Sequence, residues 1–550
     1  MKIAKVLFLF LLVSFQMFAQ SKVPYLTKHG RATQLVVNGQ PYLMIAGELH
    51  NSSASTTEYM KPLFPKLKAM NLNTVFVSVA WEQFEPKEGV FDYTLVNAII
   101  DNAKENHLKV CLLWFASWKN GESSYAPMWV KKDTKRFFRV KTKEGKAIET
   151  LSPFCEATKI ADAKAFTQLM KHIKEYDTDQ TVILMQPENE VGMFQDIDYN
   201  KVALDLFEKE VPKALMTYLK ENKKQLDTYV SNAWSKSNFK TSGTWKEIFG
   251  DTPEAKAFFT TWQYATYINF VAKSGRGQYN LPMMVNAWIV QKPDDLPGVY
   301  PNGGPVSRVM DIWKAAAPNI DVQSPDIYLP NFKEIVARYH RDDNPLLIPE
   351  STAQMGRAYY AFGAHDAICF SPFGIEDASD DFVFKKAYGV LNEIQHYILK
   401  YQGTGNMKAV LKEGNETYED LYMGDYKIKV MYEKPNEPSF GIVIQTDANE
   451  FLIIGMNLSV YFYSEKRDTT AYIGQVFEGR FENGAWVTTR MLNGDETFHN
   501  SRLRVFGRLF ESSKGIDQIN KKEGDPDAYS PSKMQKTITP GIYKVITYER

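Results

Sequence analysis

The chain has 550 residues, 44% of them hydrophobic and 24% charged, which is typical of an ordinary globular protein with two or three domains. Lys and Arg number 65, as do Asp and Glu, so there is no basic field for nucleic acid or an anionic membrane. Aromatic residues make up 13%, a surplus that fits either a large aromatic core or a cleft for carbohydrate.

The first twenty residues, MKIAKVLFLFLLVSFQMFAQ, place two lysines before a short apolar run that ends in Phe-Ala-Gln. This pattern predicts a signal peptide over 1–20, because the run is too short to span a membrane and no similar run follows. No cysteine lies near the predicted cleavage region, so a lipoprotein anchor is not expected. We therefore expect a periplasmic or secreted protein with no membrane span.

The three cysteines are Cys111, Cys155 and Cys369, so at least one is unpaired unless it bridges two chains. Cys111 and Cys369 fall inside apolar runs, where a buried, unreactive thiol is expected. The eight histidines show no metal-ligand spacing, and we expect neither a metal nor another cofactor. No pattern indicates the oligomeric state.

The segment after the predicted signal peptide, QLVVNGQPYLMIAGEL, predicts a hairpin that turns at Asn38-Gly39. From there eight strand-like runs alternate with helix-like segments such as TEYMKPLFPKLKAMN and AKAFTQLMKHIKEY. The runs are Tyr42–Leu49, Asn73–Val79, Leu108–Phe115, Thr181–Gln186, Pro282–Trp288, Asp321–Tyr328, Pro345–Pro349 and Ala367–Ser371. Eight strand–helix repeats predict a (β/α)8 TIM barrel over 21–401. A doubly wound sheet is the rival fold, but the first strand–helix turn has no GxGxxG.

The stretch 223–280 is too long for one crossover, and we interpret it as an insertion on the catalytic face or as an elongated fourth helix with a packing role. Beyond Gln402 the pattern changes to alternation at period two, with Gly, Asn and Asp between the runs. This predicts an antiparallel β-sandwich domain over 402–550, with the polar segment Lys514–Lys536 as a surface loop.

Two of the predicted barrel strands end in glutamates. The fourth ends ILMQPENEVG, with Glu188, Asn189 and Glu190, and the seventh ends PLLIPEST, with Glu350. Active sites of such barrels lie at these carboxyl ends, and strands four and seven stand nearly opposite each other across the mouth. Glycoside hydrolysis needs a pair of this kind, one carboxyl to protonate the leaving oxygen and one to attack the anomeric carbon. The residues alone leave Glu188 as a rival of Glu190.

QPENEVG, together with Glu350 in LLIPES, resembles glycoside hydrolase family 35, the β-galactosidases, within a clan of barrels that place Asn-Glu on strand four and Glu on strand seven. The similarity extends from MIAGELH through AWEQFEPKEGVFDY to the seventh strand. It implies that Glu190 is the general acid/base, that Glu350 is the nucleophile, and that Asn189 binds the sugar 2-hydroxyl. Tyr328 matches a clan position that hydrogen-bonds the nucleophile.

Other candidate sugar-binding residues are Glu48 and His50 after the first strand and Trp288 at the end of the fifth; each could instead have only a structural role at the rim. Glu85, before a proline, is expected to be structural. Two positions depart from the family: Ser78 stands where much of it has Tyr, and Ala116-Ser117-Trp118 where it commonly has Ala-Glu-Trp.

The sequence therefore predicts a retaining exo-β-galactosidase that releases terminal galactose from oligosaccharides or plant-type polysaccharides. Because the departures fall on sugar-holding positions, a clan-related β-glycosidase of other sugar specificity is the alternative within enzymes. A non-catalytic carbohydrate-binding protein is the alternative outside them.

Overall fold

The computed structural model describes residues 23–378, 383–433, 437–494, 496–509 and 538–550. The predicted signal peptide over 1–20 and the predicted loop Lys514–Lys536 lie outside these residues. No helix in the described part of the chain has both the length and the apolar character needed to cross a membrane.

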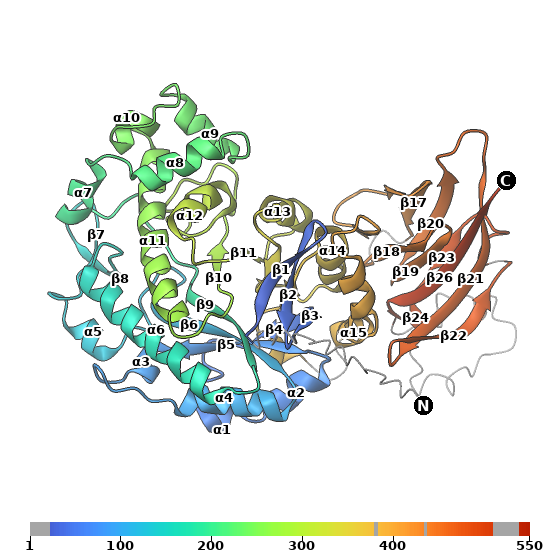
Figure 1. The fold of residues 1–550 in the computed structure, drawn as a ribbon, viewed down its shortest axis with the longest axis horizontal. Helices are drawn as coiled ribbons and strands as arrows, with labels where there is room; N and C mark the ends of the chain where they lie inside the picture. The colour runs from blue at the N-terminus through green and yellow to red at the C-terminus, as the bar shows by residue number, and fades with distance from the viewer. Residues whose placement is uncertain (1–22, 379–382, 434–436, 495, 510–537) are drawn as a thin grey trace, which may run out of the picture.

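Eight parallel strands form the barrel seen in Figure 1, which confirms the predicted fold. In order around the barrel they are β4 (Met44–Glu48), β5 (Thr74–Ala80), β6 (Lys109–Lys119), β9 (Val182–Asn189), β10 (Met284–Trp288), β11 (Val322–Ile327), β12 (Leu347–Ile348) with β13 (Glu350–Ser351), and β14 (Cys369–Phe370). The seventh strand is split because Pro349 has no N–H for the ladder. Its first half pairs with β14 and its second half with β11, so the barrel closes across the break. Strands β9 and β10 are joined by one parallel bridge, between Met185 and Met283.

Helices follow each barrel strand, as the repeat pattern predicts. They are α1 (Thr57–Met60), α2 (Leu63–Ala69), α3 (Trp81–Phe84), α4 (Thr94–Glu105), α5 (Met128–Lys132), α6 (Glu156–Tyr176), α7 (Lys201–Phe207), α8 (Lys213–Glu221), α9 (Thr228–Ser235), α10 (Trp245–Phe249), α11 (Pro253–Arg276), α12 (Met310–Ala316), α13 (Phe332–Tyr339), α14 (Met355–His365) and α15 (Val383–Tyr401). A short hairpin, β7 (Arg139–Lys141) with β8 (Ala147–Leu151), precedes α6.

Alternate residues of the barrel strands point inward and form one buried cluster, which runs from Met44 and Ala46 of β4 to Cys369 of β14. One end of this interior is covered by a small sheet, β1 (Tyr25–His29), β2 (Ala32–Val37) and β3 (Gln40–Tyr42), through Leu35 and Val37. The predicted hairpin turn is confirmed: Asn38 and Gly39 have φ of 52° and 77°, the positive values that a tight hairpin turn requires.

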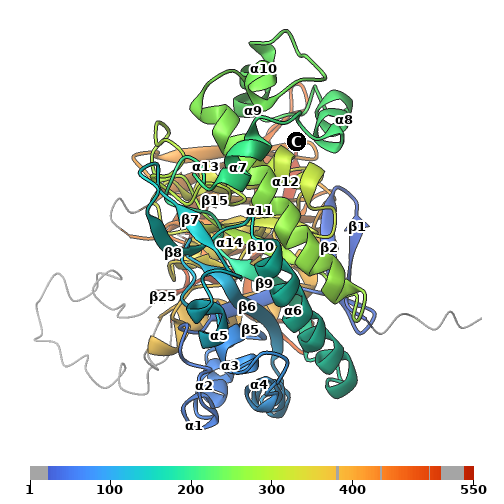
Figure 2. The ribbon, with the colours of Figure 1, turned by 90° about the vertical axis from the view of Figure 1, so that its left-hand side faces the viewer.

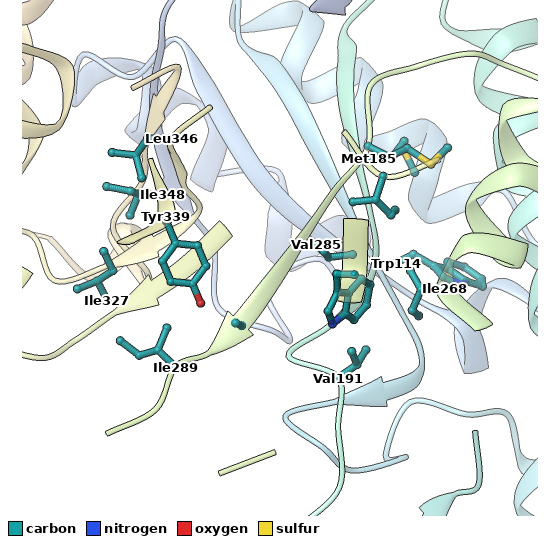
Figure 3. Packing of buried hydrophobic residues seen from close by; sticks show 14 of the residues in the cluster. Trp114, Met185, Val191, Ile268, Val285, Ile289, Ile327, Tyr339, Leu346 and Ile348 are labelled. Atoms are coloured by element: carbon teal, nitrogen blue, oxygen red, sulfur yellow. The ribbon is translucent and has the colours of Figure 1, made fainter. Parts of the chain in front are cut away.

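The outward-facing residues of the same strands pack against the helices. Figure 3 shows Trp114 of β6 and Val285 of β10 close to Ile268 of α11, all buried. The long helix α11 lies beside α6 on this side of the barrel (Figure 2). The longest element of the segment 223–280 is thus helix α11, whose buried face covers β9 and α6.

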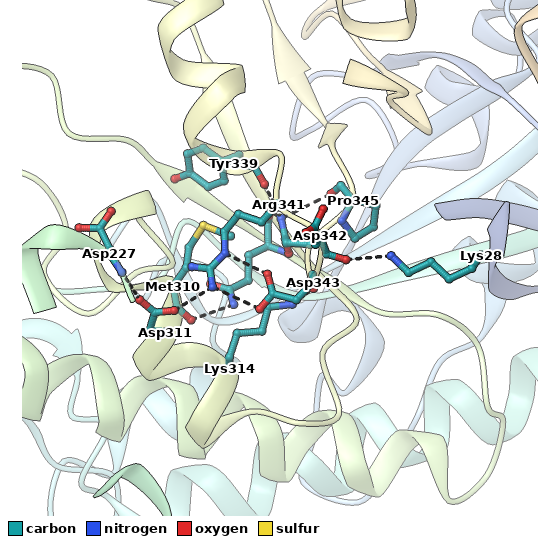
Figure 4. A network of polar contacts seen from close by, with 12 residues as sticks. Lys28, Asp227, Met310, Asp311, Lys314, Tyr339, Arg341, Asp342, Asp343 and Pro345 are labelled. Atoms are coloured by element: carbon teal, nitrogen blue, oxygen red, sulfur yellow. Dashed lines mark hydrogen bonds and ion pairs between the residues drawn. The ribbon is translucent and has the colours of Figure 1, made fainter. Parts of the chain in front are cut away.

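A polar network joins four separate segments of the barrel (Figure 4). The carboxylate of Asp311 in α12 is fully buried, and accepts hydrogen bonds from Arg341 at 2.9 Å and from the backbone N–H of Asp227 at 2.7 Å. Asp227 is the N-cap of α9, and Lys28 of β1 donates to the carbonyl of the neighbouring Asp342. The network therefore ties the start of α9 to the loop before the seventh strand.

The C-terminal part is a sandwich of two antiparallel sheets, as predicted. The larger contains β15 (Met407–Leu411), β18 (Phe440–Asp447), β19 (Glu450–Met456), β26 (Gly541–Glu549), β21 (Ala471–Glu482) and β22 (Ala485–Leu492) in that order. The smaller contains β16 (Tyr418–Met423), β17 (Tyr426–Tyr432), β20 (Leu458–Ser464) and β23 (Leu503–Val505). A two-stranded pair, β24 (Arg508–Leu509) and β25 (Ile538–Thr539), completes it. The sequence did not single out β15.

Strands β18 and β19 are buried on both faces, which differs from simple alternation. One face of the larger sheet meets the smaller sheet, and the other packs against α14 and α15 of the barrel (Figure 1). A Cβ atom on Gly363 of α14 would lie 2.7 Å from Cβ of Ala409 and 2.9 Å from Cγ1 of Ile442. The two domains therefore share a tightly packed apolar interface.

Candidate active site

The backbone between β9 and the following loop is strained where the glutamates lie. Glu188 and Glu190 have φ of 65° and 42°, in the left-handed region that side-chain-bearing residues rarely adopt. Such strain persists only where surrounding contacts impose it, and it clusters at functional sites. The contacts are present: the carbonyl of Glu190 accepts from Gly121 N–H at 3.1 Å, and its N–H donates to Oδ1 of Asn286 at 2.9 Å.

Glu188 points away from the barrel mouth. Its carboxyl accepts hydrogen bonds from three consecutive backbone N–H groups at the end of β6, of Ala116, Ser117 and Trp118, at 2.7 to 3.3 Å. The side chain is 1% exposed, and burial, with the neighbouring Asp162, raises its pKa well above the ordinary value. Glu188 therefore fixes the end of β6 against β9, and these contacts favour Glu190 over Glu188 as the acid/base.

Glu350 extends from β13 into the mouth of the barrel. Its Oε2 accepts a hydrogen bond from the Tyr328 hydroxyl at 2.7 Å. Its Oε1 is buried and has no hydrogen-bond partner among the described residues. The carboxylate is thus held by one oxygen while the other is free to react.

Glu190, Asp326 and Glu350 form a compact carboxyl cluster. One oxygen from each lies within 4.8 Å of the others, and all three side chains are buried. Glu190 and Asp326 are hydrogen-bonded to each other, which requires a proton between them. Burial and the charges of Glu350 and Glu190 raise the pKa of Asp326 well above its ordinary value.

Glu190 is poised to hold a proton near neutrality. Burial first, and the nearby charge of Glu350 second, raise its pKa from 4.5 to about 7, against the opposing effect of the Lys119 ammonium. A pKa in this range suits a group that gives up a proton and takes one back. The cluster thus pairs a carboxyl that retains its proton with a carboxylate that has one free oxygen.

Asn286 of β10 connects the parts of this site. Its Nδ2 donates to Asn189 Oδ1 at 3.0 Å and to Asp326 Oδ2 at 2.8 Å, while its Oδ1 accepts from the backbone of Glu190. Asn189 is 1% exposed, and its Oδ1 also accepts from Gln186. The amide of Asn189 is therefore fixed in orientation beside Glu190.

The other predicted sugar-binding residues lie either beside the carboxyl cluster or at the end of the barrel. Glu48 is buried beside the cluster, where burial and the charge of Glu350 raise its pKa well above the ordinary value. His50 lies at the rim and pairs with Asp377 at 2.7 Å, its ring edge-on to Phe373. Trp288 ends β10 and meets the ring of the partly exposed Phe194 edge-on, with centroids 5.7 Å apart.

Three residues of the site were missed from the sequence: Asp326, Asn286 and Lys119. The signal for the first two was available, because they follow inward-facing apolar residues at period two, as Glu48 follows Met44 and Ala46. Lys119 carried no such signal. Its register with Asn189 depends on an irregular pairing of β6 with β9.

Comparison with known proteins agrees with this geometry. Residues 34–266 match the model described as glycosyl hydrolases family 35. This match runs from β2 into α11, so this part of the barrel is similar to that family. Residues 384–504 match a second model, described as a domain of unknown function (DUF5597).

Among curated proteins, a β-galactosidase of Xanthomonas manihotis is 29% identical to this chain over 173 residues, 30% of this chain and 26% of that protein. A probable β-galactosidase C of Talaromyces marneffei is 27% identical over 177 residues, 32% of this chain and 17% of that protein. The matches thus span about a quarter or less of these relatives. The solved β-galactosidase of Rahnella sp. R3 is similar with a TM-score of 0.44 and 16% identity, over 66% of this chain and 57% of that one.

The two departures from the family pattern have structural explanations here. The Ser117 hydroxyl donates to Asp162 at 2.7 Å and contacts the Tyr267 hydroxyl at 2.8 Å, so it faces the protein interior. The Ser78 hydroxyl donates to the carbonyl of Asn51. Glu85 accepts from Trp81 and from the backbone of Gly89, as a structural residue would. The Ser117 hydroxyl therefore does not extend toward the carboxyl cluster.

The three clustered carboxyl oxygens are close enough to hold a cation as well. The Lys119 ammonium already places a positive charge near the same carboxyls. The absence of a metal stays a prediction, and chelation tests it.

Proposed function

We propose that the protein is a retaining exo-β-galactosidase acting on oligosaccharides or polysaccharides. The observation that carries the proposal is the separation of Glu190 and Glu350, whose nearest oxygens lie within 4.8 Å. Retaining enzymes place their two carboxyls about 5–5.5 Å apart, whereas inverting enzymes need about 6.5–9.5 Å to admit a water molecule. The match of residues 34–266 to the family 35 model supports the same reaction.

The proposed reaction has two steps. Glu190, protonated, donates to the glycosidic oxygen as Oε1 of Glu350 attacks the anomeric carbon, so the C–O bond to the leaving group breaks and a glycosyl ester forms. Glu190, now ionised, takes a proton from water, whose oxygen attacks the same carbon and releases Glu350. Tyr328 holds the other oxygen of Glu350 throughout and orients the carboxylate.

A panel of nitrophenyl glycosides tests the function and the sugar together. We expect the β-galactoside to be the best substrate and Glu350→Gly to abolish its turnover. A wild-type rate in Glu350→Gly would refute the assignment of the nucleophile. Release of galactose alone from a galactosylated oligosaccharide would support exo action, and longer fragments would exclude it.

A second β-glycosidase activity, on an arabinoside, fucoside or mannoside, is the alternative that a specific observation favours. Ser117 is bonded to Asp162 and faces the protein interior, and the short Ser78 hydroxyl donates to the backbone carbonyl of Asn51, so two sugar-holding side chains of the family pattern are missing. A β-galactoside that ranks last in the panel would select this alternative. Labelling with a 2-fluoro galactosyl inhibitor separates both from a non-catalytic binding protein, which would give neither adduct nor turnover.

Export to the periplasm or the medium is also proposed, on the pattern of residues 1–20. N-terminal sequencing of the protein from its native host would give a mature chain that starts near Ser21. A chain that retains Met1 would contradict it.

A further inference from the structure

Lys119 is the one lysine among the described residues that is buried, with 7% of its surface exposed. It ends β6, at the carboxyl end of the barrel. Its ammonium lies 5.0 Å above the ring of Phe115 and makes no hydrogen bond or ion pair with any residue that the structure describes. A buried ammonium has three N–H donors, and leaving them unused is costly unless a ligand takes them up.

The surroundings of this ammonium are the site itself. Four carboxyls act on it electrostatically. Glu350 has the strongest effect, followed by Glu48, Glu190 and Asp326. Three of them lie on β4, β11 and β13, and Glu190 directly follows β9, so Lys119 faces the middle of the mouth. This arrangement accounts for why the side chain remains charged while buried.

The backbone of Lys119 is held rigidly. Lys119 and Glu122 exchange two backbone hydrogen bonds, of 2.8 and 3.0 Å, around the turn Asn120-Gly121, whose φ values are both positive. The N–H groups of this turn donate to the carbonyls of Asn189 and Glu190. The base of the Lys119 side chain is therefore fixed relative to the proposed acid/base.

Ser117, two residues earlier, is fully buried and committed to Asp162 and Tyr267. Of these two side chains at the end of β6, Lys119 is thus the one that faces the carboxyl cluster. Its ligand is not an anion, because the Glu350 carboxylate already offsets the charge of this ammonium and would repel a uronate or a phosphate. A neutral sugar hydroxyl, accepting a hydrogen bond, fits this field.

We propose that Lys119 is a specificity-determining residue: its ammonium donates a hydrogen bond to one hydroxyl of the sugar that Glu350 attacks. The inference rests on the proposed glycosidase function and adds to it the donor that β6 supplies. Because a hydrogen bond from a charged group is strong and directional, it selects the sugar that places a hydroxyl at that point.

Lys119→Met in the full chain tests the proposal, since it removes the charge and the donor but keeps most of the volume. Binding of galactose and of its four monodeoxy derivatives is measured by titration calorimetry, so that turnover is not needed. We expect galactose to bind Lys119→Met about 10–100-fold more weakly than wild type. One monodeoxy sugar should show a comparable loss on the wild type and no further loss on the variant. If the loss of affinity caused by Lys119→Met and the loss caused by removing a hydroxyl multiply for all four monodeoxy sugars, the proposal is overturned.

Lys131→Met is the matched control, because Lys131 lies outside the cluster and pairs with Glu82; we expect it to bind galactose as the wild type does. If Lys119→Met fails to fold, Lys119→Arg is compared across the same sugars. If removal of a different hydroxyl weakens binding to Lys119→Arg than to the wild type, the proposal is supported. If both proteins rank the monodeoxy sugars in the same way, it is overturned. Wild-type protein that binds none of these sugars and forms no 2-fluoro adduct would refute the proposed function as well, whereas normal sugar binding by Lys119→Met would refute only the role of Lys119.

Discussion

The raised pKa of Glu190 predicts a measurable dependence of stability on pH. In the folded state this carboxyl keeps its proton up to about pH 7, whereas in the unfolded chain it loses it near 4.5. Between these values the native state binds the extra proton, so its stability falls as pH rises. The difference corresponds to about 3 kcal/mol, since a tenfold change in an equilibrium constant is about 1.4 kcal/mol. Because the side chain is 6% exposed, solvent screening is small.

Glu190→Gln removes this titration. Compared with wild type, the variant should gain about 3 kcal/mol of unfolding free energy between pH 4.5 and pH 8, on top of any constant difference at pH 4.5. Urea unfolding followed by tryptophan fluorescence measures it at the two pH values. Glu105→Gln, on the exposed surface of α4, is the control and should change stability equally at both. An equal difference at both pH values for Glu190→Gln would refute the reasoning.

Glu350→Gln provides a second check on the cause. The charge of Glu350 is the second contribution to the raised pKa of Glu190, after burial. Without that charge the pKa of Glu190 should fall, and the pH dependence of stability that belongs to Glu190 should shrink. If the pH dependence of stability keeps its full size in Glu350→Gln, burial alone raises the pKa of Glu190.

Four further outcomes follow from the site and the interface. Asp326→Asn replaces an acidic proton by a fixed N–H donor to Glu190, so the alkaline limb of kcat/KM should move to lower pH; an unchanged profile would contradict the shared proton. Glu188→Gln should keep most activity, whereas Glu190→Gln should lose about 10²–10⁴-fold on substrates with poor leaving groups; equal losses would reverse the assignment. Gly363→Ala should cost about 1–3 kcal/mol in urea unfolding, because its Cβ would press on the larger sheet. EDTA should leave activity unchanged, and loss restored by a divalent cation would show a metal.

Much of the barrel follows from local pattern. Each of the eight apolar runs became a strand, and the turn at Asn38-Gly39 has the backbone that this residue pair favours. The alternation of residues along a strand and the preference of a residue pair for a turn depend only on neighbouring residues. The sequence pattern therefore predicts both. The positions of Glu190 and Glu350 at strand ends follow from the same pattern, because all barrel strands point their carboxyl ends to one face.

What lies on each face of the larger sheet was decided by the tertiary structure. The alternating runs of the C-terminal domain predict one buried and one exposed face. Strands β18 and β19 are nevertheless buried on both, because α14 and α15 pack against the face that would otherwise meet solvent. The sequence of a sheet does not show which helix from elsewhere in the chain will cover one of its faces.

The sequence by itself determined that two strand ends carry carboxyls, and the tertiary structure decided what each one does. Glu188 and Glu190 are two residues apart and chemically identical, yet one is bound by three backbone N–H groups of β6 and the other faces Glu350. Protonation and reactivity depend on burial, on nearby charges and on donors brought from distant parts of the chain. These contacts exist only after the barrel has closed, which is why Asp326 and Lys119 join the site in the structure and not in the pattern.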